Sequence, residues 1–237
     1  MNIVTIKSPN FSKKLRKKKD IKIIVLHYTG MQSKIVSIKR LLNTKIKNKV
    51  SCHYLIDRNG QIIKMVDENK IAWHAGKSKW KSFTNMNKNS IGIELVNKGH
   101  EFGYQYFSKP QIRSLIWLCK KLKKKYSIKI ENFLGHSDVA PLRKIDPGEK
   151  FPWKILSNHK LGKWYRLKTL KNEINSKKIK ILFFRNLKKI GYRYFDIKKR
   201  SIHDKKVIYS FQQHYLPKNL TGKIDKKTYK ISLFLTN

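Results

Sequence analysis

The sequence has few acidic residues, and this shortage is its most unusual compositional feature. Asp and Glu number 14 among 237 residues, whereas Lys and Arg number 56, which gives a formal net charge of +42. A charge of this size attracts polyanions such as nucleic acid, anionic lipid or an acidic wall polymer. The lysines are spread through a chain that is also rich in Ile and Asn, and this spread indicates genomic bias as the main cause of the charge.

Cysteine and long apolar runs are also scarce. Cys52 and Cys119 are the only cysteines and neither belongs to a CxxC pair, so the sequence offers no thiolate metal site and leaves a disulfide open. Apolar runs such as residues 23–26 are far shorter than the roughly 20 residues of a membrane span. The N-terminus lacks the apolar segment of a secretory signal peptide. We therefore expect a cytoplasmic protein without a transmembrane segment, with the periplasm or cell wall as the alternative.

The order of apolar patterns predicts an α/β protein. Residues 21–28 form a β-branched run that is apolar on both faces, as in a central strand covered on two sides. Two further strand-like runs flank Asn59-Gly60, which is a strong hairpin signal. Helical spacing occurs at residues 35–42, between the first strand and the hairpin, and again after the predicted cap Ser108. Strands that alternate with helices in this way predict a mixed central sheet flanked by helices.

A second, smaller unit is expected at the C-terminal end of the chain. Three short amphipathic segments occur there: the first stops at Gly191, the second stops at Pro217, and the third begins at the cap Asp225. Three such helices can form a small module. The predicted organisation is a first domain over residues 1–168 with its core at about 20–155, a linker over residues 169–178, and a three-helix module over residues 179–237.

Three residues near predicted strand ends form the strongest candidate site. His27 ends one strand, His136 follows another, and Asp146 lies in a loop. Two imidazoles and one carboxylate leave the fourth position of a tetrahedral Zn²⁺ open for water, as in catalytic zinc sites. A histidine at a strand end can equally have a structural role. Pro147 restricts the residue before it to an extended conformation, so the side chains of Lys144 and Asp146 should point the same way.

Glu94 lies in the middle of a predicted strand, where a carboxylate is unexpected. It shares one face of that strand with Gly92, opposite three apolar residues. Such a carboxylate is either functional or an exposed residue of an edge strand. In the functional interpretation, Glu94 takes the proton of a water acidified by the metal, and Lys144 stabilises the oxyanion. The residues by themselves therefore argue for metal-assisted amide hydrolysis.

Five stretches occur in a fixed order along the first domain. They are Ile24–Thr29, Val50–Ile56, Ala72–Gly76, Ser90–Leu95, and Gly135–Asp138 together with Lys144–Gly148. Together they resemble the type 2 N-acetylmuramoyl-L-alanine amidase domain, a fold also used by animal peptidoglycan recognition proteins. The resemblance implies hydrolysis of the amide bond between N-acetylmuramic acid and the L-alanine of the stem peptide.

The resemblance also implies a role for each candidate residue. His27, His136 and Asp146 match the ligands of one zinc ion per chain. Glu94 matches the acidic catalytic residue of the bacterial branch, and Lys144 matches the lysine that stabilises the transition state.

The hairpin motif departs from part of the family. Some relatives carry a catalytic tyrosine where this chain has Cys52, which favours Glu94 as the base and makes Cys52 a small packed side chain. Four signature positions are expected near the cleft, either as substrate contacts or as hydrogen-bonded structural residues. They are His53, Tyr54, Trp73 and His74.

The C-terminal segment adds a second resemblance. Residues 207–215 and 221–228 resemble the helical peptidoglycan-binding domain that often follows this amidase. We therefore expect a zinc amidase of cell-wall turnover or recycling, with peptidoglycan or muropeptides as its partner. The alternative is a recognition protein that binds wall fragments without cleaving them. Specific nucleic-acid binding is not expected, because the sequence has no organised stripe of basic and aromatic residues. The oligomeric state is not predicted.

Overall fold

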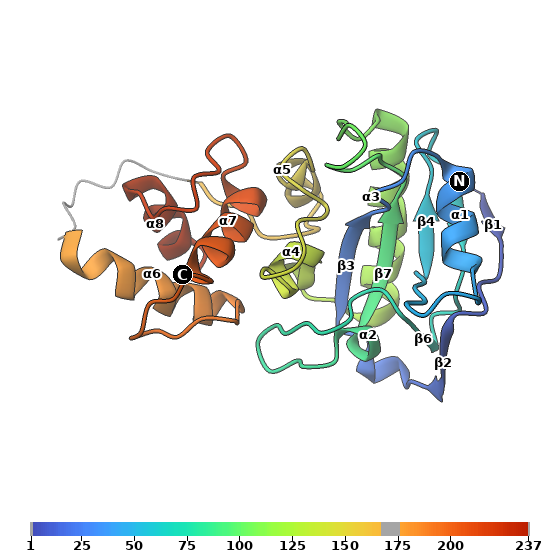
Figure 1. Cartoon of the computed structure of the whole chain (residues 1–237), viewed down its shortest axis with the longest axis horizontal. Coiled ribbons are helices and arrows are strands. Elements are labelled where there is room, and N and C mark those ends of the chain that lie inside the picture. Colours follow the sequence, from blue (N-terminus) through green and yellow to red (C-terminus); the bar gives the residue numbers. More distant parts are fainter. Residues whose placement is uncertain (1, 167–175, 237) are drawn as a thin grey trace.

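The computed structural model describes residues 2–166 and 176–236. Figure 1 shows an α/β domain and a group of C-terminal helices, with two short helices between them. Most of the predicted linker, residues 169–175, lies outside the described residues. The first C-terminal helix begins at Ser176, three residues before the predicted start of the C-terminal module at residue 179.

A six-stranded mixed sheet forms the centre of the larger domain, which confirms the predicted fold class. The strand order is β1-β5-β4-β7-β3-β8, and only the β4–β5 pair is antiparallel. A separate antiparallel pair joins β2 to β6. The strands are β1 (Ile3–Thr5), β2 (Phe11–Leu15), β3 (Ile23–Tyr28), β4 (Tyr54–Ile56), β5 (Ile62–Lys64), β6 (Lys70–Ala72), β7 (Ser90–Leu95) and β8 (Phe133–Gly135).

Helix α3 covers one face of this sheet. It begins after Ser108, whose hydroxyl accepts a hydrogen bond from the backbone N–H of Gln111, as the cap signature predicted. Its apolar stripe packs in one cluster with alternate strand residues such as Ile24 and Ile91. The helices of the domain are α1 (Lys34–Leu42), α2 (Met86–Asn89), α3 (Lys109–Tyr126), α4 (His136–Val139) and α5 (Trp153–Asn158).

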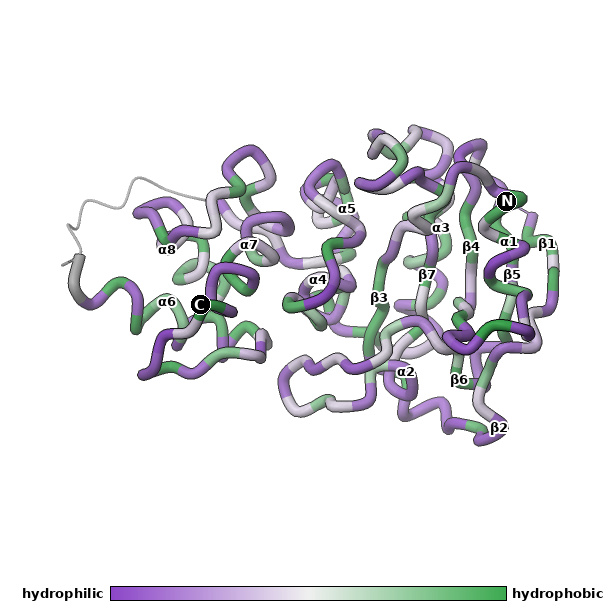
Figure 2. The backbone as a smooth tube through the Cα atoms, viewed as in Figure 1, coloured by the Kyte–Doolittle hydropathy of each residue, from purple (hydrophilic) through white to green (hydrophobic). Residues whose placement is uncertain are grey.

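The opposite face of β3 belongs to a cluster that includes the C-terminal helices. Ile23 and Val25 share this cluster with residues of α6, α7 and α8. The strand can serve both faces because it is apolar throughout its first four residues, which appear in hydrophobic colours in Figure 2. Helix α1 packs in a third cluster with residues of β4 and β5. The C-terminal helices are α6 (Ser176–Ile190), α7 (Asp204–Tyr215) and α8 (Lys226–Phe234).

Several local predictions are confirmed, and one is wrong. Strands β4 and β5 form the predicted hairpin, with Gly60 at a φ of 91°. The side chain of Asp225 accepts a hydrogen bond from the backbone N–H of Thr228 and so caps α8. The strand predicted over residues 21–28, however, begins only at Ile23: Ile21 lies before β3 and packs in the α3 cluster, whereas Ile23 packs with the C-terminal helices. Within the described ranges, no helix is long and apolar enough to cross a bilayer.

Candidate active site

The candidate site lies at the carboxyl ends of the parallel strands β7, β3 and β8, where open α/β sheets commonly bind ligands. His27 lies near the end of β3, and Glu94 is its register neighbour on β7. Strand β8 ends at Gly135, directly before His136 at the start of α4. The topology therefore brings residues from distant parts of the chain to one cavity of about 490 Å³.

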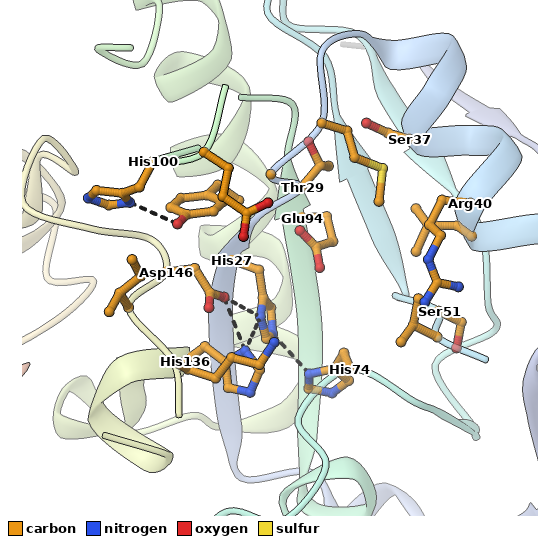
Figure 3. Close-up of a pocket in the computed structure, with 18 of the residues that line it drawn as sticks. His27, Thr29, Ser37, Arg40, Ser51, His74, Glu94, His100, His136 and Asp146 are labelled. Carbon is orange, nitrogen blue, oxygen red and sulfur yellow. Dashed lines mark hydrogen bonds and ion pairs between the residues drawn. The ribbon is translucent and has the colours of Figure 1, made fainter. Parts of the chain in front are cut away.

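His27, His136 and Asp146 place three potential ligand atoms at the corners of a small triangle (Figure 3). Nδ1 of His27 lies 2.9 Å from Oδ2 of Asp146 and 3.1 Å from Nδ1 of His136, which lies 3.1 Å from the same Oδ2. A tetrahedral zinc ion with bonds of about 2.0–2.1 Å separates its ligands by roughly 3.3–3.4 Å. The triangle is close to one face of such a tetrahedron, so these three buried residues fit a metal site.

Hydrogen bonds behind the triangle turn both Nδ1 lone pairs toward it. The Nε2–H of His136 donates to the carbonyl oxygen of Ala75 at 3.1 Å. The Nε2–H of His27 donates to Nδ1 of His74 at 3.0 Å. Each imidazole is thereby held in the tautomer whose Nδ1 is free to bind a metal.

His74 is itself held in the tautomer that this arrangement needs. The hydroxyl of Ser90 donates to the carbonyl oxygen of Met86, so the Ser90 oxygen accepts from the Nε2–H of His74 at 3.3 Å. A Cβ atom at position 92 would lie 2.4 Å from the His74 ring, so Gly92 is required for the ring to fit. The glycine two residues before Glu94 therefore clears space for His74.

The charges in the triangle also suit a metal. Burial, together with the neighbouring His136, lowers the pKa of His27 to about 4, so this imidazole is neutral at pH 7. Burial acts to raise the pKa of Asp146, but its interactions with His136 and His27 outweigh burial and hold that pKa well below its usual value. The triangle thus includes a carboxylate and a neutral imidazole, both of which are zinc ligands.

Glu94 lines the cavity beside the triangle and is partly exposed there. Burial, followed by the charge of Asp146, raises the pKa of Glu94 well above its usual value, whereas Lys144 acts in the opposite direction. The Oε2 atom of Glu94 is buried and has no hydrogen-bond partner in the described part of the chain. Buried polar atoms usually have a hydrogen-bond partner. A role of Glu94 as the acceptor of a proton from a ligand would account for the missing partner. Lys144 lines the same cavity.

The four predicted substrate contacts divide into one that lines the cavity and three that do not. His74 lines it. His53 is fully buried, with both ring nitrogens near backbone groups, and Tyr54 is buried with its hydroxyl donating to Glu68. Trp73 is half-buried beside the cavity residues but does not line the cavity. His53 and Tyr54 therefore match the alternative of hydrogen-bonded structural residues, because they are buried and do not line the cavity.

Cys52 is fully buried in the cluster beneath α1, as expected for a small packed side chain. Burial raises the pKa of its thiol well above the usual value, which disfavours the reactive thiolate. Cys119 lies in the α3 cluster, and both cysteines are free.

Much of the cavity wall could not be predicted from the sequence. Tyr28 and Arg143 adjoin predicted site residues in the chain, so their neighbours were an available signal. The remaining polar residues come from α1 and from loops whose position over the cavity depends on packing. The polar residues that were not predicted are Tyr28, Thr29, Ser37, Arg40, Ser51, His100, Glu101 and Arg143.

Comparison with known families gives one match that covers most of the larger domain. The model of the family described as N-acetylmuramoyl-L-alanine amidase (Amidase_2) matches residues 17–149. That range contains the triangle, Glu94 and Lys144, so the family match and the geometry point to the same cavity.

Characterised relatives extend the similarity beyond this range. The N-acetylmuramoyl-L-alanine amidase AmiD of Escherichia coli is 35% identical over 228 residues, covering 90% of this chain and 81% of AmiD. The 1,6-anhydro-N-acetylmuramyl-L-alanine amidase AmpD of Haemophilus influenzae is 34% identical over 165 residues, covering 63% of this chain and 87% of AmpD.

Solved structures resemble the chain over nearly its whole length. The complex of E. coli AmiD with the substrate anhydro-N-acetylmuramic acid-L-Ala-D-gamma-Glu-L-Lys has a TM-score of 0.78 at 30% identity, and covers 96% of this chain and 92% of its own. Pseudomonas aeruginosa AmpDh3 in complex with anhydromuramic pentapeptide has a TM-score of 0.79 at 28% identity, and covers 97% and 96% of the two chains.

Proposed function

The chain belongs to the N-acetylmuramoyl-L-alanine amidase family of hydrolases, and on this premise we propose that it works with one zinc ion held by His27, His136 and Asp146. The observation that carries the zinc assignment is the triangle of two imidazole Nδ1 atoms and one carboxylate oxygen. Two histidines and one carboxylate are a ligand set of catalytic zinc sites, whereas Mg²⁺ and Ca²⁺ prefer oxygen ligands.

The residues around the triangle have distinct roles in this proposal. A bound zinc ion would acidify a water molecule and polarise the carbonyl oxygen of the scissile amide. Glu94 accepts the proton of the attacking water at its unpartnered Oε2 and passes it to the leaving nitrogen. Lys144 stabilises the negative charge that develops on the carbonyl oxygen. Burial suits Glu94 to this task because its raised pKa makes it a stronger base than a free glutamate.

We further propose that the substrates are anhydromuropeptides. Two of the solved structures that resemble the chain over nearly all its length contain an anhydromuramyl peptide. Cleavage of such a molecule between the anhydro sugar and L-alanine releases the stem peptide, a reaction that fits cell-wall recycling. Reduced, non-anhydro muropeptides are the comparison substrates, and faster cleavage of the anhydro form would support this assignment.

The test combines metal content with product analysis for the wild type and Asp146→Ala. Purified wild-type protein is expected to contain about one zinc ion per chain and to release peptides that begin with L-alanine from purified muropeptides. Asp146→Ala is expected to lose most of the zinc and the cleavage together, because it removes one of three protein ligands.

Asp67→Ala is the matched control, since it removes a carboxylate that is 46% exposed and forms a surface ion pair with Lys64. This control should keep both zinc and activity. Protein that binds muropeptides but stays inert after zinc is added would instead support the recognition alternative. Full cleavage by the metal-free wild type would refute the zinc proposal.

A further inference from the structure

Arg40 is a cation in the wall of the cavity, and no described residue forms an ion pair with it. It lies in the last turn of α1, and its Nη2 donates to the carbonyl oxygen of Asn48 at 2.8 Å. Its Nη1 is buried and has no hydrogen-bond partner within residues 2–166 and 176–236. A buried donor without an acceptor is costly for the folded protein. Because Arg40 lines the cavity, a ligand can supply the missing acceptor.

Ser51 offers a second donor on the same side of the cavity. Its side chain is buried, and its Oγ accepts a hydrogen bond from the backbone N–H of Trp73 at 2.8 Å. That bond uses a lone pair and leaves the hydroxyl hydrogen for a ligand oxygen. Figure 3 shows Arg40 and Ser51 together, on the side of the cavity away from His136 and with Glu94 between.

A guanidinium beside a hydroxyl is suited to a carboxylate. The peptide held by the AmiD structure has such a group near the scissile bond. It contains D-gamma-Glu after L-Ala, and a gamma linkage leaves the α-carboxylate of that glutamate free. Each extended residue spans roughly 3.5 Å, so this carboxylate lies about two residue lengths from the scissile amide. Figure 3 shows the triangle on one side of the cavity and Arg40 on the other, so a peptide that extends from the triangle toward α1 carries this carboxylate toward Arg40.

We propose that Arg40, with Ser51, binds the free α-carboxylate of the second stem-peptide residue and makes the enzyme selective for acidic over amidated stem peptides. The inference rests on the proposed function, because it assumes that the peptide beyond the scissile bond extends toward α1. Binding of the sugar toward α1 is the competing orientation.

Two substrates that differ in one group test this selectivity. One carries D-gamma-Glu at the second peptide position, and the other carries the α-amide, D-isoglutamine. Arg40→Ala is expected to lower kcat/KM for the acidic substrate by about 10- to 100-fold, the range for losing a hydrogen bond to a charged group. For the amidated substrate the loss should be less than about threefold, because the amide carries no charge to pair.

Lys39→Ala is the matched control. It removes a cation from the adjacent position of α1, where the side chain is exposed and does not line the cavity. It should change kcat/KM for both substrates equally and only slightly. Arg40→Lys keeps the charge without the planar fork and should retain part of the preference for the acidic substrate.

Equal losses for both substrates in Arg40→Ala would overturn the proposal and favour the orientation with the sugar toward α1. A wild type that does not prefer the acidic substrate would also overturn it. If the wild type cleaves neither substrate, the proposed function fails, and binding of the same two peptides by calorimetry decides the role of Arg40. Tighter binding of the acidic peptide, lost in Arg40→Ala, would then still support it, and equal binding would refute it.

Discussion

At the scale of single residues, Glu94 and the metal triangle should be separable by mutation. Glu94→Gln keeps the shape of the side chain but cannot accept a proton. We expect kcat to fall by about 10²- to 10⁴-fold while the zinc content stays near one ion per chain. Steady-state kinetics and metal analysis of the same preparation measure the two effects. Loss of zinc along with activity would show that Glu94 supports the metal site instead of moving a proton.

His74 should act on the metal through His27. His74→Leu removes the acceptor that holds the Nε2–H of His27, so His27 loses its fixed tautomer. We expect zinc affinity to fall by about 10- to 100-fold, measured by competition with a chelator. Ser90→Ala removes the next bond in the same chain and should have a smaller effect in the same direction. Unchanged affinity in His74→Leu would mean that the ring only fills space.

The sequence could identify site residues where the chemistry is written in a short motif. His27, His136 and Asp146 could be predicted because strand ends and the Asp-Pro pair restrict where their side chains point. Arg40 and Ser51 were not, because their place in the cavity depends on how α1 packs over the sheet. His53 shows the converse: its position in a signature motif reflects a buried hydrogen-bond network rather than access to the cavity.

At the scale of elements, α4 is a four-residue helix that begins with His136 and needs support from outside. Its Asp138 is 1% exposed, which requires that the carboxylate be fully bonded. Oδ2 accepts from the backbone N–H of Gly135 at 2.7 Å and lies 2.7 Å from Nδ1 of His214 on α7. Oδ1 accepts from the hydroxyl of Tyr192 at 2.5 Å. The C-terminal helices therefore stabilise the element that carries a metal ligand.

His214→Ala tests this support. It leaves the carboxylate of Asp138 without one buried partner and removes a ring stacked on Trp153 at a centroid distance of 3.8 Å. We expect the free energy of unfolding to fall by about 3–5 kcal/mol, measured by urea denaturation. His203→Ala, an exposed histidine just before the same helix, should change it by no more than about 0.5 kcal/mol. Similar losses in both variants would contradict the role of the Asp138 contact.

Glu68 connects β4 to the end of α3 and makes stability depend on pH. Burial acts to raise the pKa of Glu68, but hydrogen bonds from Lys125, Tyr126 and Tyr54 outweigh burial and lower it. A lowered pKa in the folded state means that the carboxylate stabilises the protein above the unfolded pKa of about 4.3, and that this contribution is lost as pH falls.

Glu68→Gln is therefore expected to lower the urea midpoint at pH 7. The difference from the wild type should shrink as pH falls from about 5 to about 3, because the wild-type carboxyl then becomes protonated as well. A difference that is constant over this range would show that the amide disturbs packing rather than charge.

Most elements of the fold could be predicted because periodicity and capping are local properties. The hairpin at Asn59-Gly60 and the caps at Ser108 and Asp225 needed only a few neighbouring residues. The contact of Asp138 with His214 joins positions that are 76 residues apart, and neither residue carries a local signal of its partner. The sequence likewise did not predict that residues of β3 and of the C-terminal helices would pack in one hydrophobic cluster.

At the scale of the whole molecule, the net charge of +42 should affect substrate capture. Stem peptides carry carboxylates, and a positive field raises their rate of encounter with the cavity. We expect kcat/KM to fall several-fold between about 0.05 M and about 0.5 M salt, with little change in kcat. An equal fall for an uncharged substrate analogue would contradict an electrostatic origin.

The cytoplasmic location and the binding of wall polymer by the C-terminal helices stay predictions.

The hydrophobic cluster between β3 and the C-terminal helices has a consequence for how such enzymes diversify. The ring of Trp80 in the larger domain lies 4.9 Å, centroid to centroid, from the ring of Tyr192. A Cβ atom at Gly191 would lie 2.4 Å from the Trp80 ring. Recombination that exchanged only the C-terminal helices would leave these large side chains facing an unmatched partner. The loop around Trp80 and the turn after α6 should therefore be inherited as a pair, with substitutions in one compensated by substitutions in the other.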